Sequence, residues 1–237
     1  AATRSRLKKR GILKDLFRET ATDEVALAVD YLTGHLPQGR IGLGPALVRD
    51  ALGDILGNEG VPLTVADTNA CFDKIAATSG TGSTSRKRAL LADLFSRAAP
   101  PDRDFLARLV LGELRQGALE AVILEGIADA AAVDIHLVQR AAMLTADPAR
   151  VAEIAFESGN SGLAGIRLEV MSPVRPMLAQ PADTMRAAFD ASDEAFVETK
   201  LDGARVQVHR DGEIVRVFTR QLNEVTASVP EVVEAVL

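Results

Sequence analysis

The sequence predicts an all-α domain followed by the opening strands of an α+β domain. Three features predict this fold class. Apolar residues recur at three- and four-residue spacings from residue 3 to about 158, three prolines fall within 166–182, and two segments with β-type alternation flank Asp211-Gly212. The first spacing places apolar side chains on one face of each helix, and the alternation does the same for half-buried strands. We therefore predict a helical domain over 1–165 and a second domain over 166–237 that the chain does not complete.

Helices in the first domain are predicted from apolar spacing and from residues that favour helix starts. Asp67 and Asp102 stand where a capping or first-turn carboxylate belongs, and Asp147-Pro148 combines a cap with an early proline. The composition changes in the glycine- and serine-rich stretch 158–165, which predicts a domain boundary near residue 165. The predicted helices cover 23–33, 44–56, 67–77, 85–98, 102–112, 118–131, 134–144 and 147–158.

The second domain is predicted to pass from extended chain to sheet. The prolines of 166–182 forbid a regular helix, so an extended crossing segment is expected there. Asp211-Gly212 has the composition of a two-residue hairpin turn. The predicted elements are a short helix over 183–190, strands over 194–200, 204–210 and 213–220, and a helix from about 229.

The overall composition limits the class of protein. Apolar residues make up 47% of the chain but aromatic residues only 4%, which favours a core of packed helices. No stretch approaches the ~20 apolar residues of a membrane span, and residues 1–11 lack the apolar run of a secretory signal. The single cysteine, Cys71, excludes an internal disulfide and fits a reducing cytoplasm. We expect Cys71 to be a small core residue of a helix rather than a reactive thiol.

Charge is unevenly distributed along the chain. The net charge is −6, yet residues 1–18 contain seven basic residues and one acid, which gives this stretch a charge of +6. A second basic cluster, Arg86-Lys87-Arg88, lies in the acid-free stretch 74–92. Basic patches on an acidic protein can bind phosphate groups, although solvated helix faces explain the same residues equally well.

Three glycine-containing turns are candidate phosphate sites. GRIGLG (39–44) and RQG (115–117) each place an arginine and a glycine before an apolar helix, and SGTGSTSRKR (79–88) joins a Gly/Ser loop to three cations. Glycine allows close backbone approach, and the positive end of a helix dipole favours an anion. Ordinary helix–helix turns and, for 79–88, a mobile surface loop are the alternatives. The candidate residues are Arg40, Gly42, Gly44, Ser83, Arg86, Lys87, Arg115 and Gly117.

The stretch KLDGAR (200–205) lies where one predicted strand ends and the next begins. Strand alternation groups the polar residues around it onto shared faces. A layer that combines one acid with several cations suits an anionic ligand that also needs a hydrogen-bond acceptor, whereas any one of these residues alone would be a solvated strand residue. The predicted faces contain Glu198 with Lys200, Arg205 with Gln207 and His209, and Arg216 with Phe218 and Arg220.

The spacing Lys-x-Asp-Gly-x-Arg over 200–205 matches motif I of the covalent nucleotidyltransferases. Its surroundings, PVRPMLAQ, ETKLDGARVQVH and VFTRQLNEVT, resemble ATP-dependent DNA ligases. The helical half resembles the amino-terminal DNA-binding domain of the same enzymes in RIGLG, in the basic loop at 79–88 and in FLARLVLGELRQGALE. The resemblance covers essentially the whole chain and is closest to ligase B of mycobacteria and related actinobacteria.

This resemblance implies a helical DNA-binding domain followed by the start of an adenylation domain, with Lys200 as the nucleophile that attacks the α-phosphate of ATP. Attack requires an unprotonated amine, so the lysine pKa must fall from about 10.4 through nearby cations and desolvation. AMP then passes to the 5′-phosphate at a DNA nick, where the 3′-hydroxyl displaces it. By resemblance, Glu198 binds adenine, and Arg205 and Arg220 lie at the nucleotide. Mg²⁺ is implied by the same chemistry, although no cluster in the sequence has metal-ligand spacing.

The ends of the sequence predict a piece of a longer polypeptide. The chain starts without Met, and its last residues, PEVVEAVL, stop inside an amphipathic helical pattern without a capping residue. The later acidic and paired-lysine motifs of the family and its oligonucleotide-binding domain do not occur in the sequence. We therefore expect residues 1–237 to bind DNA without sealing nicks alone.

Other functions remain open on the sequence. A DNA-binding module without ligation is one, and an RNA ligase or mRNA-capping guanylyltransferase shares the lysine motif. NAD-dependent ligases share it too, but their preceding domain differs in kind from this helical one. The resemblance implies nicked double-stranded DNA as the partner of a monomeric bacterial protein in the cytoplasm, associated with the nucleoid when bound to DNA and without a membrane contact.

Overall fold

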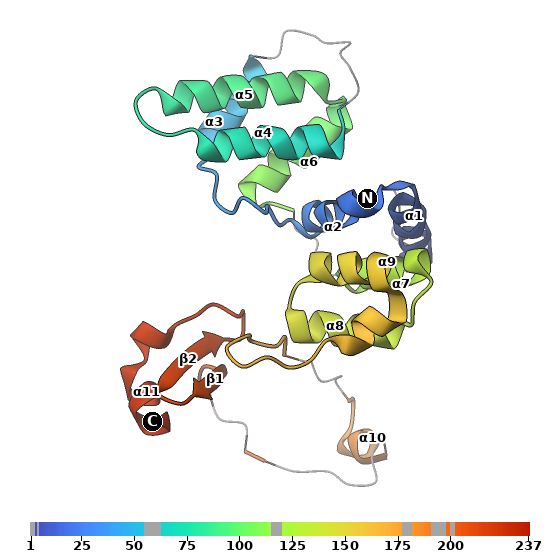
Figure 1. Cartoon of the computed structure of the whole chain (residues 1–237), viewed down its shortest axis with the longest axis vertical. Coiled ribbons are helices and arrows are strands. Elements are labelled where there is room, and N and C mark those ends of the chain that lie inside the picture. Colours follow the sequence, from blue (N-terminus) through green and yellow to red (C-terminus); the bar gives the residue numbers. More distant parts are fainter. Residues whose placement is uncertain are drawn as a thin grey trace. The chain divides into compact units, whose positions relative to one another are not determined.

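The computed structural model describes residue 3 and residues 5–54, 63–114, 120–176, 182–190, 198–199 and 202–237. The chain divides into two compact units, Ala1–Gln139 with Asp147–Ala164 and Arg140–Ala146 with Gly165–Leu237. The described part is mostly helical, with one two-stranded antiparallel sheet near the carboxy terminus (Figure 1). Its helices are α1 (Arg6–Glu19), α2 (Val25–Thr33), α3 (Pro45–Gly53), α4 (Val65–Ala77), α5 (Ser83–Arg97), α6 (Pro100–Leu111), α7 (Glu120–Ala131), α8 (Ile135–Thr145), α9 (Pro148–Gly165), α10 (Met185–Asp190) and α11 (Pro230–Val236). The strands are β1 (Val206–Asp211) and β2 (Ile214–Thr219), and short 3-10 turns cover Thr22–Glu24 and Thr226–Ser228.

Helices α1 and α7 pack against each other in the first unit. Phe17 of α1 is fully buried, and Gly126 lets α7 approach this helix closely. Arg10 forms an ion pair with Asp129 of α7, and the Arg10 guanidinium, by hydrogen bonding, lowers the pKa of the Asp129 carboxyl. Arg6 pairs in the same way with Glu125. Part of the basic cluster of residues 1–18 is therefore matched by acids of α7, rather than free to bind phosphate.

A second core lies among α3, α4, α5 and α6. Phe72 of α4 and Phe95 of α5 are fully buried within it. Helix α4 begins with a capping box, because the Thr64 hydroxyl accepts the Asp67 N–H while the Asp67 carboxylate accepts the Thr64 N–H. Asp67 thus has the first-turn role expected of it. Cys71 is partly buried on α4, and burial raises the pKa of its thiol to about 11, so the unreactive protonated form is the stable one.

Helix boundaries match the predicted segments closely, with differences at two places. Residues 6–19 form a helix of their own, α1, which was not among the predicted segments. The last helix of the first unit was predicted to end at residue 158, but α9 continues to Gly165. Gly159 has a φ of 57°, so the helix breaks there and resumes, and this explains how a Gly/Ser-rich stretch belongs to it.

The second unit contains the hairpin and the crossing segment before it. Residues 166–176 form no helix, as the prolines predict, and residues 177–181 lie outside the described part. The hairpin turn is Gly212-Glu213, one residue later than predicted, because Asp211 and Ile214 still pair. Gly212 has the left-handed φ of 58° that this tight turn uses. Of the predicted strand 194–200, the structure describes residues 198 and 199, and neither is in a strand.

The register of the hairpin places the expected polar residues on one face. Gln207 pairs with Phe218, and His209 pairs with Arg216, so these four side chains lie on the same side of the sheet. The opposite face includes Val215 and Val217, which are buried. The predicted grouping of residues on β1 and β2 is confirmed for these four positions.

One half-buried acid makes the stability of the first unit depend on pH. Burial raises the pKa of the Asp30 carboxyl on α2 from 3.8 to about 6, with Asp147 adding to the rise and His35 opposing it. A carboxyl whose folded-state pKa is raised stabilises the fold below its unfolded pKa and loses that stabilisation as pH rises. We expect Asp30→Asn to increase the free energy of unfolding at pH 7 by about 1 kcal/mol, after discounting for solvent screening.

Urea unfolding of the parent and of Asp30→Asn across pH 3.5 to 8 measures this effect. The advantage of the variant should grow as pH rises through about 6, the folded-state pKa of Asp30, and should vanish below about pH 4. Asp23→Asn on the adjoining 3-10 turn is the matched control, since the Asp23 side chain is exposed. Equal stability of the parent and Asp30→Asn at pH 7 would show that burial of the carboxyl costs nothing.

Candidate functional site

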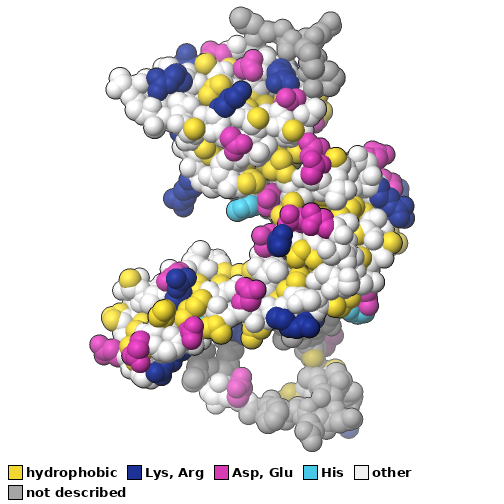
Figure 2. All heavy atoms as spheres, in the orientation of Figure 1, with side chains coloured by type: hydrophobic (Ala, Val, Ile, Leu, Met, Phe, Trp, Pro, Cys, Tyr) yellow, Lys and Arg dark blue, Asp and Glu magenta, His cyan; other side chains and the backbone are white. Residues whose placement is uncertain are grey.

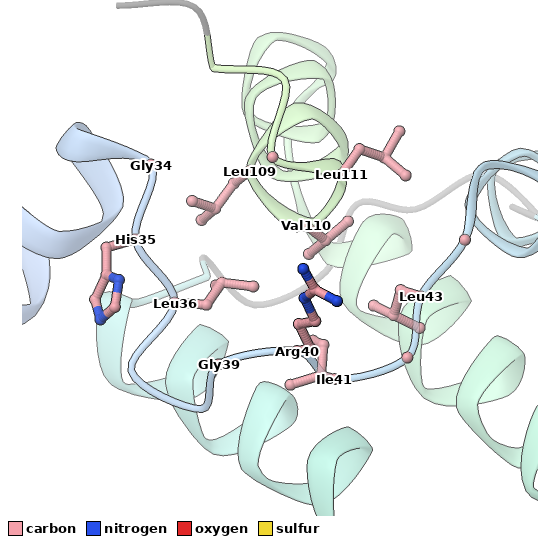
Figure 3. A pocket seen from close by; sticks show the side chains of 13 residues that line it. Gly34, His35, Leu36, Gly39, Arg40, Ile41, Leu43, Leu109, Val110 and Leu111 are labelled. Atoms are coloured by element: carbon pink, nitrogen blue, oxygen red, sulfur yellow. The ribbon is translucent and has the colours of Figure 1, made fainter. Parts of the chain in front are cut away.

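A groove in the first unit contains the first predicted phosphate turn. Residues 34–36 and 39–44, between α2 and α3, and residues 109–112, at the end of α6, line a volume of about 700 Å³. Arg40 is exposed, and its side chain points from the loop toward Val110 (Figure 3). Gly42 has a φ of 73°, which favours glycine at this turn. Gly44 then caps the start of α3, where Pro45 occupies the first helical turn.

Lys87 of α5 links this turn to the basic cluster. Its Nζ donates a hydrogen bond of 2.7 Å to the carbonyl oxygen of Ile41. A Cβ atom on Gly42 would lie 3.1 Å from the same Nζ, so the glycine makes room for the ammonium group. Two stretches that are 46 residues apart in sequence, each predicted to bind phosphate, thus lie side by side.

The other cations of this cluster have roles within the fold. Arg86 donates to the carbonyl oxygens of Thr81 (2.9 Å) and Ser79 (2.8 Å), and it thereby closes the loop before α5. Arg88 forms an ion pair with Asp54 at 3.1 Å. Figure 2 shows basic and acidic side chains interspersed on the visible face of α3 to α6, rather than one continuous basic patch. Any phosphate contact here therefore depends on a few individual groups rather than on a broad basic surface.

The start of α5 retains the features expected of an anion site. Gly82 caps the helix with a φ of 74°, and Ser83 is its first residue. The first turn of α5 contains no acid, so the positive end of the helix dipole is not neutralised there. Arg115 and Gly117 of the third turn lie outside the described residues, which end before them at Leu114.

The second unit contains a small pocket that is lined in part by Arg205, the last residue of the motif-I stretch. Arg205, just before β1, and Arg220, just after β2, line a volume of about 130 Å³. Val174 and Pro176 of the crossing segment form another part of its wall. Two guanidinium groups beside an apolar wall can hold one phosphate group, and the volume is small for a whole nucleotide. Lys200 lies outside the described residues, and Glu198 is exposed and is not among the described residues that line this pocket.

The structure gives a role to two residues for which the sequence predicted a position only. Gln207 and His209 had been placed on one strand face, without a function. Both bind the backbone of the crossing segment, Gln207 at Val174 and His209 at Met171. The sequence pattern could show the shared face, but it could not show which distant segment covers it.

Neither a metal centre nor a membrane segment is present in the described part of the chain. No group of three or more His, Cys, Asp or Glu side chains in those ranges is arranged to hold a metal ion. Among the same residues, none of the helices has the length and apolar character that crossing a membrane requires.

Comparisons with known proteins identify the family. Residues 58–128 match the family model described as DNA ligase N terminus, and residues 176–237 match the one described as ATP dependent DNA ligase domain. The chain is 52% identical over 236 residues to a probable DNA ligase of Anaeromyxobacter sp. (strain Fw109-5), with 100% of this chain and 46% of the relative covered. It is 48% identical over 238 residues to a probable DNA ligase of Rhodococcus jostii (strain RHA1), with 99% and 46% covered. The chain thus spans less than half the length of the curated relatives it matches. With two matching ligase domains and this identity over its whole length, the chain belongs to the ATP-dependent DNA ligase family.

Proposed function

We propose that this chain is the amino-terminal portion of an enzyme that uses ATP to seal nicks in duplex DNA. The observation that carries the proposal is the pocket lined by both Arg205 and Arg220, because Arg205 is the last residue of the sequence KLDGAR. Two cations lining one pocket suit a phosphate group, and we propose that this phosphate reacts with the lysine of the same sequence motif. The family to which the chain belongs supports the same reaction.

The proposed reaction has three steps, each a displacement at phosphorus. The Lys200 amine, after losing a proton, forms a bond to the α-phosphorus of ATP, and the bond to the β-phosphate breaks to release pyrophosphate. An oxygen of the DNA 5′-phosphate next displaces the lysine and takes the AMP. The 3′-hydroxyl then attacks the 5′-phosphate, forming the phosphodiester and releasing AMP.

The site residues have distinct proposed roles. Arg205 and Arg220 bind phosphate oxygens, and Glu198 accepts a hydrogen bond from adenine. Mg²⁺ is part of the proposal as the ion that accompanies the ATP phosphates. We assign it no protein ligands, because the described residues bring no metal-ligand cluster together. Incubating the full-length protein with α-labelled ATP and Mg²⁺ tests the proposal, and covalent label is the expected result.

The helical residues 1–165 are proposed as the domain that binds nicked duplex DNA, and residues 166–237 as the start of the adenylation domain. The groove around Arg40 supports this division, because an exposed guanidinium and glycine-rich backbone suit the phosphates of a duplex. We further propose that residues 1–237 alone bind nicked DNA as a monomer without sealing it. Since DNA is the substrate, the proposed location of the full-length bacterial protein is the nucleoid.

Arg40→Ala is expected to weaken binding of residues 1–237 to nicked duplex about five- to tenfold at 50 mM salt. Loss of one phosphate contact should also reduce the slope of log K against log salt by about 1. Fluorescence anisotropy across 50 to 200 mM salt measures both quantities. Arg150→Ala is the matched control, because Arg150 forms an exposed ion pair with Glu153 on α9. An unchanged slope in Arg40→Ala would remove Arg40 from the DNA contact.

A DNA-binding module without ligation is the second candidate function, and the groove around Arg40 favours it for residues 1–237 taken alone. DNA binding without covalent label in the full-length protein would select it over the ligase. Labelling from GTP as efficiently as from ATP would instead indicate capping chemistry.

A further inference from the structure

The side chain of Gln207 holds the backbone of the crossing segment at two points. Its Oε1 accepts the Val174 N–H at 3.0 Å, and its Nε2 donates to the Val174 carbonyl oxygen at 2.6 Å. One side-chain amide thus satisfies both polar groups of a single residue, much as a neighbouring strand would. Proline supplies no N–H at 173 or 176, so Val174 is a position in this short stretch at which such pairing is available.

A second side chain on the same strand face holds the segment three residues earlier. The His209 Nδ1 accepts the Met171 N–H at 3.1 Å, and the imidazole ring packs edge-on against Phe218 at 5.2 Å. Met171 has a φ of 69°, a conformation that costs free energy in a residue other than glycine. The hydrogen bond to His209 helps to maintain that conformation.

The opposite side of the segment is also anchored within the second unit. The Arg175 N–H donates to the Met143 carbonyl oxygen at 2.9 Å, and Arg175 Nη2 donates to that of Ala146 at 3.0 Å. Neighbouring residues of extended backbone point to opposite sides, so Val174 faces the hairpin while Arg175 faces the end of α8. The segment is therefore fixed between two elements.

We propose that Gln207 is a positioning residue for the phosphate-sized pocket that Arg205 and Arg220 line. Val174, Pro176 and Gln207 line the same pocket as Arg205 and Arg220. By fixing Val174, Gln207 holds the apolar wall at a set distance from the two guanidinium groups, and His209 secures the same segment from Met171. This inference rests on the proposed function, because it concerns how that pocket is shaped for a phosphate of ATP.

Amide hydrogen exchange in residues 1–237 tests the contact itself, independently of any activity. In the parent, the Val174 and Met171 amides should exchange slowly. Gln207→Leu has nearly the same volume but no hydrogen bonds, and it should speed exchange at Val174 about tenfold or more while leaving most of the hairpin protected. Gln207→Glu retains an acceptor for the Val174 N–H and should retain its protection. Gln139→Leu, the same substitution at an exposed position of α8, is the control.

Covalent labelling of the full-length protein tests the positioning role. Gln207→Leu should raise the ATP concentration that gives half-maximal labelling about tenfold, with the maximal extent of labelling unchanged, and Gln139→Leu should change neither. Gln207→Glu should fall between the parent and Gln207→Leu, because it restores one of the two bonds. This separation of affinity from extent distinguishes positioning from a general loss of folded protein.

Three results would overturn the inference, each in a recognisable way. Fast exchange of the Val174 amide in the parent would mean that the contact does not persist. Lost protection with an unchanged ATP requirement would mean that the segment does not shape the pocket, while the proposed function would stand. A parent protein that takes no label would refute the proposed function, and with it the positioning role, even if exchange shows the contact.

Discussion

Replacing Lys200 with alanine is expected to abolish covalent transfer of label from α-labelled ATP to the full-length protein. The amine at this position is proposed to form the bond to phosphorus, and a methyl side chain offers no nucleophile in its place. A loss of more than about a thousandfold is expected, as for other enzymes whose nucleophile is removed. Lys200→Arg should be equally inactive, because a guanidinium stays protonated at any pH of the assay.

Lys8→Ala is the matched control for this prediction. Lys8 is an exposed lysine on α1, so its replacement changes the charge of the protein by the same amount without touching the second unit. Full labelling of Lys8→Ala beside none in Lys200→Ala would place the reaction at the motif. Labelling of Lys200→Ala at the parent level would assign the nucleophile to another residue.

Local periodicity explains why the helices of the first unit and the hairpin of the second could be predicted. Both follow from the spacing of apolar residues within one segment, which depends on the geometry of that segment alone. The shared face of Gln207 and His209 followed from the same geometry, and the register confirms it. The turn at Gly212-Glu213 was placed one residue early because the pattern does not say which residue makes the last pair.

Long-range pairings could not be predicted from such patterns. The basic cluster at the amino terminus was interpreted as a possible phosphate patch, yet Arg10 pairs with Asp129, 119 residues later in the chain. The Lys87 ammonium donates a hydrogen bond to the carbonyl oxygen of Ile41, and the Arg86 guanidinium donates to a carbonyl oxygen of the loop before its own helix. For Arg10 and Lys87 the partner is a carboxylate or carbonyl whose position depends on how the helices pack. The number of basic residues in the sequence is therefore larger than the number of cations that are available to contact DNA.

Gly126→Val is expected to lower the free energy of unfolding of the first unit by about 3 kcal/mol. A Cβ at this position would lie 2.8 Å from Leu13 Cβ and 3.4 Å from Phe17 Cε2. Neither a new rotamer of Leu13 nor its truncation to alanine relieves the first contact, because the backbone of α1 fixes the Cβ atom. Helices α1 and α7 must then separate, and partial exposure of Phe17 adds the cost of lost packing.

Gly11→Val is the control that separates this close contact from the general effect of valine in a helix. Gly11 lies on α1 itself, and a Cβ there meets no atom within 4 Å, so stability should change by a few tenths of a kcal/mol at most. Urea unfolding followed by helical circular dichroism measures both variants. Arg10→Ala should lower the free energy of unfolding by less in the Gly126→Val background than in the parent, because both changes act on the α1–α7 interface. Equal stability of Gly11→Val and Gly126→Val would mean that the two helices tolerate separation. The amino-terminal cations would then be held in place by their ion pairs with α7 rather than by the glycine contact.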